Sequence, residues 1–126
     1  MPHLISIIDD DPSVRAATNN LLSSRGYDVQ VFASAPEFLR SEVLAATSCV
    51  IADIQMPFMN GLELLRQMRN DGRQTPFIFI TANAERSVRA RAIEAGGICL
   101  LAKPFTTTTL INCLIAALEG LDDTRK

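Results

Sequence analysis

Acidic, hydroxyl and basic side chains stand at or just after the ends of four short apolar runs in this chain. Asp9 and Asp10 follow the first run, Asp53 ends a central run, and Thr81 and Lys103 follow two later runs. Carboxylates that lie close together repel one another where the dielectric constant is low, and a hard divalent cation relieves the repulsion. An oxygen-only ligand set without Cys or His favours Mg²⁺ or Mn²⁺ over Zn²⁺. The sequence therefore predicts a magnesium site wherever these runs end together.

A site of this kind suits phosphoryl chemistry, because Mg²⁺ commonly completes its octahedron with phosphate oxygens. Asp53 is then a nucleophile toward a phosphoryl donor, Lys103 offsets charge on the transferred group, and Thr81 donates a hydrogen bond to one of its oxygens. Each residue also has a simpler explanation. The acidic turn could stabilise a helix N-terminus, the lysine could be an ordinary surface residue, and the threonine could cap a helix. Their occurrence together favours the functional interpretation.

The apolar runs alternate with helical patterns along the chain. They predict five buried strands, at residues 4–8, 27–32, 49–53, 76–80 and 98–101. The segments between these runs have the sequence patterns of helices. Apolar residues recur at helical spacing between residues 12 and 26, and a capping box precedes a helix that carries Phe38, Leu39 and Val43. Three further helices are predicted around residues 62–68, 84–95 and 110–118.

Strict alternation of strand and helix predicts an α/β fold, a single doubly wound parallel sheet with helices on both faces. The carboxyl ends of parallel strands meet at one edge of such a sheet, which is where open α/β sheets place their chemistry. The polar residues are therefore expected to come together at that edge.

Composition limits the class of protein. A chain of 126 residues, 48% hydrophobic, is expected to form one domain spanning residues 1–126. A net charge of −2 gives no electrostatic reason for direct nucleic acid binding, and no apolar run long enough for a membrane span or signal peptide is present, so a cytoplasmic location is expected. Cys49, Cys99 and Cys113 lack metal-ligand spacing and are interpreted as small hydrophobic residues.

The polar residues and their neighbours form motifs similar to those of a known family. The motifs are Ile8-Asp9-Asp10, Asp53-Ile54-Gln55-Met56-Pro57 followed by Asn60-Gly61, Ile80-Thr81-Ala82, and Ala102-Lys103-Pro104-Phe105. In this order and spacing they resemble the receiver domain of bacterial two-component response regulators, with its CheY-like fold, and especially the FixJ-like group. The resemblance covers essentially the whole chain and implies a (βα)5 domain with sheet order 2-1-3-4-5.

The resemblance also implies roles for the residues around the metal. Asp10 and Asp53 would bind Mg²⁺ directly, with Mn²⁺ as a substitute, and the main-chain carbonyl of Gln55 would be a third ligand. Asp9 would act mostly through a bound water. These roles are expectations carried over from the family.

By the same resemblance, Asp53 would accept a phosphoryl group from a phosphohistidine on a sensor histidine kinase or a histidine phosphotransfer protein. Thr81 would be the switch hydroxyl, Lys103 would pair with the phosphoryl group, and the Lys103-Pro104 peptide would be cis. Such a domain is a phosphoacceptor rather than an enzyme toward other molecules, and it would catalyse only its own phosphorylation and slow dephosphorylation.

The chain departs from the family pattern at Leu100, where many receivers carry Tyr or Phe. Leucine provides no ring to turn inward, so we expect the shift of Thr81 to be transmitted by the helix predicted at 84–95 and its preceding loop. The apolar face of that helix is thin, with Val88, Ala92 and at most Ile93, which is typical of an element that moves easily.

Two other classes of protein share features of this sequence. A phosphohydrolase of the haloacid dehalogenase type also has an aspartate nucleophile, but it carries a second Asp where this chain has Gln55. A pseudo-receiver that binds partners without phosphorylation is disfavoured by the intact polar set. The output is left open: the chain could be a single-domain regulator or the receiver part of a longer protein. The face built by the fourth helix, fifth strand and last helix could form a homodimer or bind an effector.

Overall fold

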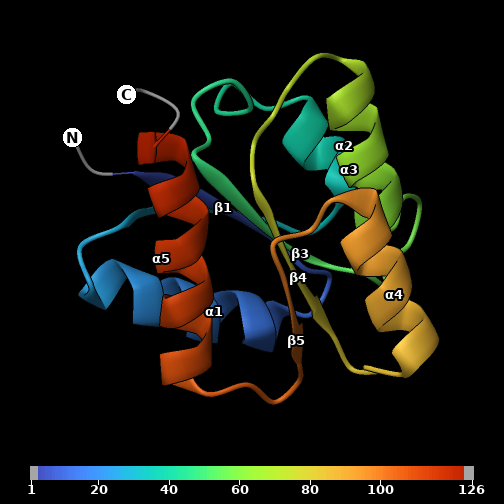
Figure 1. Cartoon of the computed structure of the whole chain (residues 1–126). Coiled ribbons are helices and arrows are strands. Elements are labelled where there is room, and N and C mark those ends of the chain that lie inside the picture. Colours follow the sequence, from blue (N-terminus) through green and yellow to red (C-terminus); the bar gives the residue numbers. More distant parts are fainter. Residues whose placement is uncertain (1–2, 124–126) are drawn as a thin grey trace.

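The computed structural model describes residues 3–123, in which five strands and five helices alternate (Figure 1). The elements are β1 (Leu4–Ile8), α1 (Pro12–Ser24), β2 (Asp28–Phe32), α2 (Ala35–Leu39), β3 (Cys49–Asp53), α3 (Gly61–Asn70), β4 (Phe77–Thr81), α4 (Arg86–Ala95), β5 (Cys99–Ala102) and α5 (Thr107–Asp123). The predicted alternation is confirmed. None of the described helices has the length and apolar character needed to cross a lipid bilayer.

The strands form one parallel sheet in the order β2-β1-β3-β4-β5, as the family resemblance implied. Its register aligns Ile8 of β1 with Ala52 of β3, and Asp53 with Ile80 of β4. The carboxyl ends of these strands therefore lie side by side. The polar residues that follow them are brought to one edge of the sheet.

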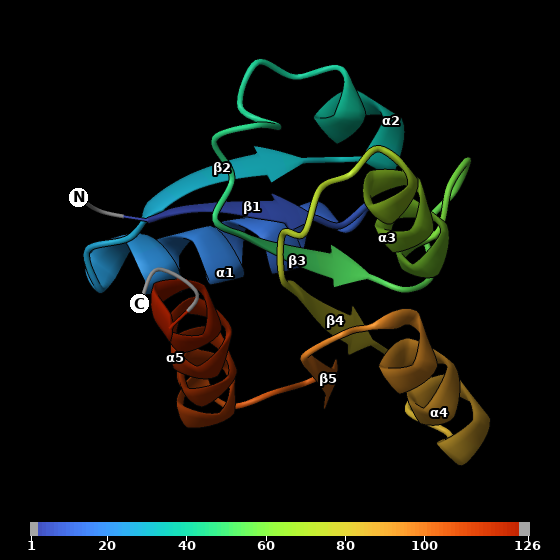
Figure 2. The same ribbon diagram turned by 45° about the horizontal axis from the view of Figure 1, so that its top comes forward.

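Helices cover both faces of the sheet, with α1 and α5 on one side and α2, α3 and α4 on the other (Figures 1 and 2). Two hydrophobic clusters match this division. The α1/α5 side includes Ile5, Ile7, Leu22, Ile51, Ile78, Leu110 and Leu114, and the other side includes Phe38, Val50, Leu65, Met68, Phe77, Phe79 and Val88. Because both faces are covered, every residue of β3 and β4 is buried, which explains their continuous apolar sequence.

The second helix is shorter than the sequence predicted. Ser34 caps it as expected, but it ends at Leu39, so the placement of Val43 in this helix was wrong. The backbone amide and the hydroxyl of Ser41 both donate to the Phe38 carbonyl, at 3.0 and 2.7 Å. These short-range bonds compete with continuation of the helix and end it.

The apolar face of α4 is as thin as the sequence indicated. Val88 and Ala92 are buried, whereas Ile93 is 64% exposed and does not extend that face. Its N-cap residue, Glu85, makes no side-chain capping hydrogen bond. Two buried side chains and an uncapped start leave α4 with few interactions to hold it in one position.

The start of α3 lies unusually close to the end of β3. A Cβ atom added to Gly61 would lie 2.6 Å from the main-chain oxygen of Asp53. The helix start is fixed by a capping box between Asn60 and Glu63, and the Gly61 amide donates to the Ile54 carbonyl at 3.0 Å. This close approach requires glycine and holds the loop that follows Asp53.

We therefore expect Gly61→Ala to lower the free energy of unfolding by about 3 kcal/mol, because backbone atoms must move to admit the methyl group. Gly72→Ala is the matched control, because its Cβ would meet no atom within 4 Å. Only the φ of +83° at Gly72 opposes this substitution, and that backbone strain should lower the free energy of unfolding by about 1 kcal/mol. Urea unfolding of both variants measures the difference. Equal destabilisation would show that the approach at Gly61 is not tight.

Candidate functional site

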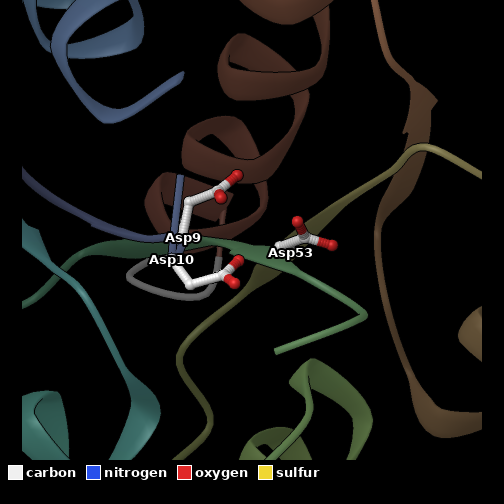
Figure 3. Close-up of side chains that lie close together, drawn as sticks. All are labelled: Asp9, Asp10 and Asp53. Atoms are coloured by element: carbon white, nitrogen blue, oxygen red, sulfur yellow. The ribbon is translucent and has the colours of Figure 1, made fainter. Parts of the chain in front are cut away.

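Three carboxylates gather at the carboxyl edge of the sheet (Figure 3). Asp9 and Asp10 follow β1 directly, and Asp53 is the last residue of the neighbouring strand β3. Ligand oxygens of the three lie within 4.8 Å of one another. Asp9 and Asp53 are buried while Asp10 is exposed, so the cluster opens to solvent on one side. The sequence predicted this grouping.

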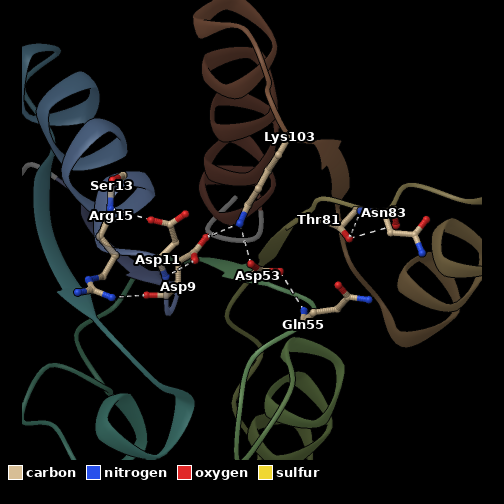
Figure 4. A network of polar contacts seen from close by, with 9 residues as sticks. All are labelled: Asp9, Asp11, Ser13, Arg15, Asp53, Gln55, Thr81, Asn83 and Lys103. Atoms are coloured by element: carbon tan, nitrogen blue, oxygen red, sulfur yellow. Dashed lines mark hydrogen bonds and ion pairs between the residues drawn. The ribbon is translucent and has the colours of Figure 1, made fainter.

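Lys103 bridges the two buried carboxylates (Figure 4). Its Nζ lies 2.7 Å from Asp53 Oδ2 and 3.0 Å from Asp9 Oδ2. Burial alone would lower the pKa of Lys103, but the hydrogen bonds and charges of the two carboxylates outweigh it and raise that pKa. Its backbone amide also donates to the Thr81 carbonyl at 2.8 Å. The lysine predicted from the sequence is therefore held against the acidic cluster by both main chain and side chain.

The negative charge of the Asp9 carboxylate is only partly offset by its surroundings. Burial raises its pKa, as does the charge of Asp53, against the hydrogen bond from the Asp11 amide and the contact with Lys103. Its Oδ2 atom is buried and, among the described residues, has no partner with the geometry of a hydrogen bond despite the nearby ammonium group. A buried carboxylate oxygen in this state can accept a hydrogen bond from a water bound to a cation.

This donor set fits a hard divalent cation. The cluster contains carboxylate oxygens alone, and the charge of Lys103 offsets only part of its negative charge. Mg²⁺ prefers such oxygen ligands. Gln55 follows two residues after Asp53, and its backbone amide donates to Asp53 Oδ1 at 2.9 Å, which orients the carboxylate.

The Thr81 hydroxyl, at the end of β4, is fully buried and engaged by the next loop. It donates to the Asn83 carbonyl at 3.1 Å and accepts from the Asn83 amide at 3.0 Å (Figure 4). The hydroxyl is thereby tied to the β4–α4 loop rather than to the carboxylates. To donate to a group on Asp53, the hydroxyl would have to give up its hydrogen bond to the Asn83 carbonyl.

Three residues of the network in Figure 4 were missed from the sequence: Ser13, Arg15 and Asn83. Arg15 Nη1 donates to the main-chain oxygen of Asp9 at 2.7 Å, so the first turn of α1 holds the end of β1. An arginine one turn into the helix that follows an acidic run is the signal that could have indicated it. Nothing in the sequence indicates that the Asn83 main chain would hold Thr81.

Leu100 lies within the core on the α4 side of the sheet. Its side chain is 8% exposed and belongs to the same cluster as Phe79, Val88 and Ala92. The Lys103-Pro104 peptide that follows is cis, as the resemblance implied. The position that is aromatic in many receivers is therefore occupied here by a packed aliphatic side chain.

An apolar groove borders the cluster. It has a volume of about 530 Å³ and lies between α1 and the segment that joins β5 to α5. Its lining is Val14, Ala17, Thr18, Leu21, Lys103, Pro104, Phe105 and Thr107. Lys103 thus faces both the carboxylates and this apolar surface.

Known proteins are similar to this chain in sequence and in fold. Residues 5–115 match the family described as the response regulator receiver domain. The response regulator protein TodT of Pseudomonas putida strain F1 is 38% identical over 116 residues, which are 92% of this chain and 51% of TodT. The transcriptional regulatory protein FixJ of Bradyrhizobium diazoefficiens is 30% identical over 122 residues, 97% of this chain and 60% of FixJ. The chain thus spans about half to three fifths of the length of these relatives.

Solved structures of similar proteins have the same fold as this chain. The chemotaxis protein CheY4 of Vibrio cholerae superimposes with a TM-score of 0.85 at 27% identity, over 94% of this chain and all of that one. The structure named FixJ-N superimposes with a TM-score of 0.84 at 29% identity, over 94% of this chain and 95% of that one. The parallel sheet, the acidic edge with its lysine, and these matches lead to one conclusion: the chain belongs to the response regulator receiver domain family, in its FixJ-like group.

Proposed function

We propose that Asp53 accepts a phosphoryl group from a phosphohistidine of a sensor histidine kinase or a histidine phosphotransfer protein. The observation that carries the proposal is the cluster of Asp9, Asp10 and Asp53 at the sheet edge with Lys103 against it. An Asp53 oxygen attacks phosphorus, the bond from phosphorus to the imidazole nitrogen breaks, and the imidazole leaves with the bonding electrons.

Lys103 stays within reach of the group on Asp53 and offsets its negative charge. Asp10, Asp53 and the Gln55 carbonyl would hold Mg²⁺, with Asp9 acting through water, and Mn²⁺ would substitute. The ion would neutralise the carboxylates and the phosphoryl oxygens. The chain phosphorylates only its own carboxylate, Asp53. Water then slowly attacks the phosphoryl group and returns Asp53 to its free form.

Phosphorylation then changes the β4–α4 region. A phosphoryl oxygen on Asp53 offers the Thr81 hydroxyl a charged acceptor, which forms a stronger hydrogen bond than the Asn83 carbonyl does. Thr81 then no longer holds the β4–α4 loop, and this loop leads into α4. Only two buried side chains of α4 hold that helix against the core. Leu100 has no aromatic ring that could turn inward, so the β4–α4 loop and α4 transmit the movement of Thr81.

The output surface is proposed to be the face of α4, β5 and α5. Three large apolar side chains are exposed in these elements or just before β5: Ile93 at 64%, Ile98 at 49% and Ile115 at 43%. Exposed apolar residues of this kind favour protein contacts. A second copy of the chain or an effector would bind there.

The first test is phosphorylation of the purified chain by phosphoramidate. Intact mass should show the gain of one phosphoryl group with Mg²⁺ and none with EDTA. Asp53→Asn should abolish the gain because no nucleophile remains, and Asp71→Asn, an exposed acid outside the cluster, should keep it. A folded parent chain that gains nothing would favour a binding module that works without phosphorylation.

Magnesium binding is tested without any phosphoryl donor. At a Mg²⁺ concentration ten times Kd, the native state should gain about 1.4 kcal/mol, seen as a higher Tm. Asp10→Asn should lose most of this shift, because it removes a ligand charge. Asp11→Asn is the control: it keeps the oxygen that caps Ser13 and lies outside the cluster. Equal Mg²⁺ shifts in both variants would contradict the proposed ligands.

The switch is tested by hydrogen exchange with beryllofluoride as the phosphoryl mimic. We expect exchange in residues 82–95 to change on binding the mimic, and Thr81→Val to abolish most of that change while phosphorylation is retained. Thr18→Val, at another buried threonine, should respond like the parent. An unchanged 82–95 segment in the parent would refute transmission through α4.

A further inference from the structure

The β3–α3 loop presents one large side chain that the fold does not use. Phe58 is 90% exposed, more than any other large apolar side chain whose burial is described. Its neighbours Met56 and Met59 pack against the core cluster on the α3 side. A phenylalanine in this position gains almost nothing from burial, so folding does not explain its presence.

The backbone at Phe58 is also unfavourable for this residue type. Its φ is +72°, and the Met59 amide donates to the Pro57 carbonyl at 2.9 Å, so Phe58 is the central residue of a γ-turn with positive φ. Such turns are rare and strained, and L residues avoid positive φ whereas Gly adopts it freely.

The loop itself imposes this turn. On one side the Gln55 amide is bonded to Asp53, and on the other the Asn60–Glu63 capping box and Gly61 fix the start of α3. The tip has little freedom between these anchors. A smaller residue would satisfy the same backbone with less strain, so a strained and solvent-exposed Phe at this tip points to a role outside the chain.

The position of the loop identifies the partner. Asp53 is 5% exposed and lies only five residues before Phe58. A protein that delivers a group to such a recessed carboxylate must bring its surface against the loops that surround it. We propose that Phe58 is a contact residue for the phosphohistidine-bearing protein, setting how tightly that donor binds; this rests on the proposed function. Phe58 does not touch the reacting atoms.

The test compares a protein donor with a small one in Phe58→Asn. The protein donor is an autophosphorylated histidine kinase chosen because it phosphorylates the parent chain, and the small donor is phosphoramidate. We expect kcat/KM for the kinase to fall about tenfold or more, mainly through a higher KM. Phosphoramidate labelling should stay within about twofold, since Asp53 is intact. Tm should not fall, because the exposed Phe58 side chain has almost no burial to lose.

Val31→Thr is the control. It replaces another exposed apolar side chain, on the edge strand β2 and outside the proposed output surface, and should leave both donors unaffected. Unchanged transfer from the kinase to Phe58→Asn would overturn the proposal, as would equal slowing with both donors, which would show that Phe58 shapes the site itself. A parent dimer that Phe58→Asn dissociates in sedimentation would assign the residue to self-association instead. Failure of phosphoramidate to label parent Asp53 would refute the proposed function, a separate outcome.

Discussion

The structure depends on holding three carboxylates together at one edge of a sheet. Unit charges 4.8 Å apart repel by about 3.5 kcal/mol at an effective dielectric constant near 20, and Asp9 and Asp53 are shielded from bulk water. Lys103 offsets part of this repulsion, and Asp9 Oδ2 remains buried without a hydrogen bond. The site is therefore prepared to take up further positive charge.

The surroundings of the cluster divide into a tightly held part and a lightly held part. In the tightly held part, Gly61 packs against the Asp53 carbonyl, the capping box fixes α3, and Arg15 holds the end of β1. On the other side, Thr81 is bonded to a loop that leads into the lightly packed α4. A chemical change at Asp53 would therefore shift the β4–α4 loop and α4, because fewer contacts hold these segments in place.

Phe58 shows the same division between folding and function at the level of one residue. The anchored loop forces a positive φ on its tip, and the residue there is neither small nor buried. Natural sequences are generally consistent from local preference to global fold, and departures from that consistency concentrate at functional sites. The groove beside Lys103 adds apolar surface on another side of the cluster, so the recessed carboxylate is bordered by surfaces suited to protein contact.

The sequence by itself determined the parallel α/β fold and the grouping of Asp9, Asp10, Asp53, Thr81 and Lys103. Alternating apolar runs specify parallel strands, and the ends of parallel strands must meet at one edge. Tertiary structure alone decided which of two adjacent aspartates is buried, that Lys103 bridges two carboxylates, and that the Thr81 hydroxyl is turned toward Asn83. It also decided the early end of α2 and the positive φ of Phe58. The burial of Asp9 and the bridge made by Lys103 depend on contacts between segments distant in the chain, and the turn at Phe58 depends on loop closure between anchored ends; local residue patterns encode neither. The Thr81–Asn83 bonds and the end of α2 are local, but several local hydrogen bonds compete at such positions, and only the folded chain decides which of them forms.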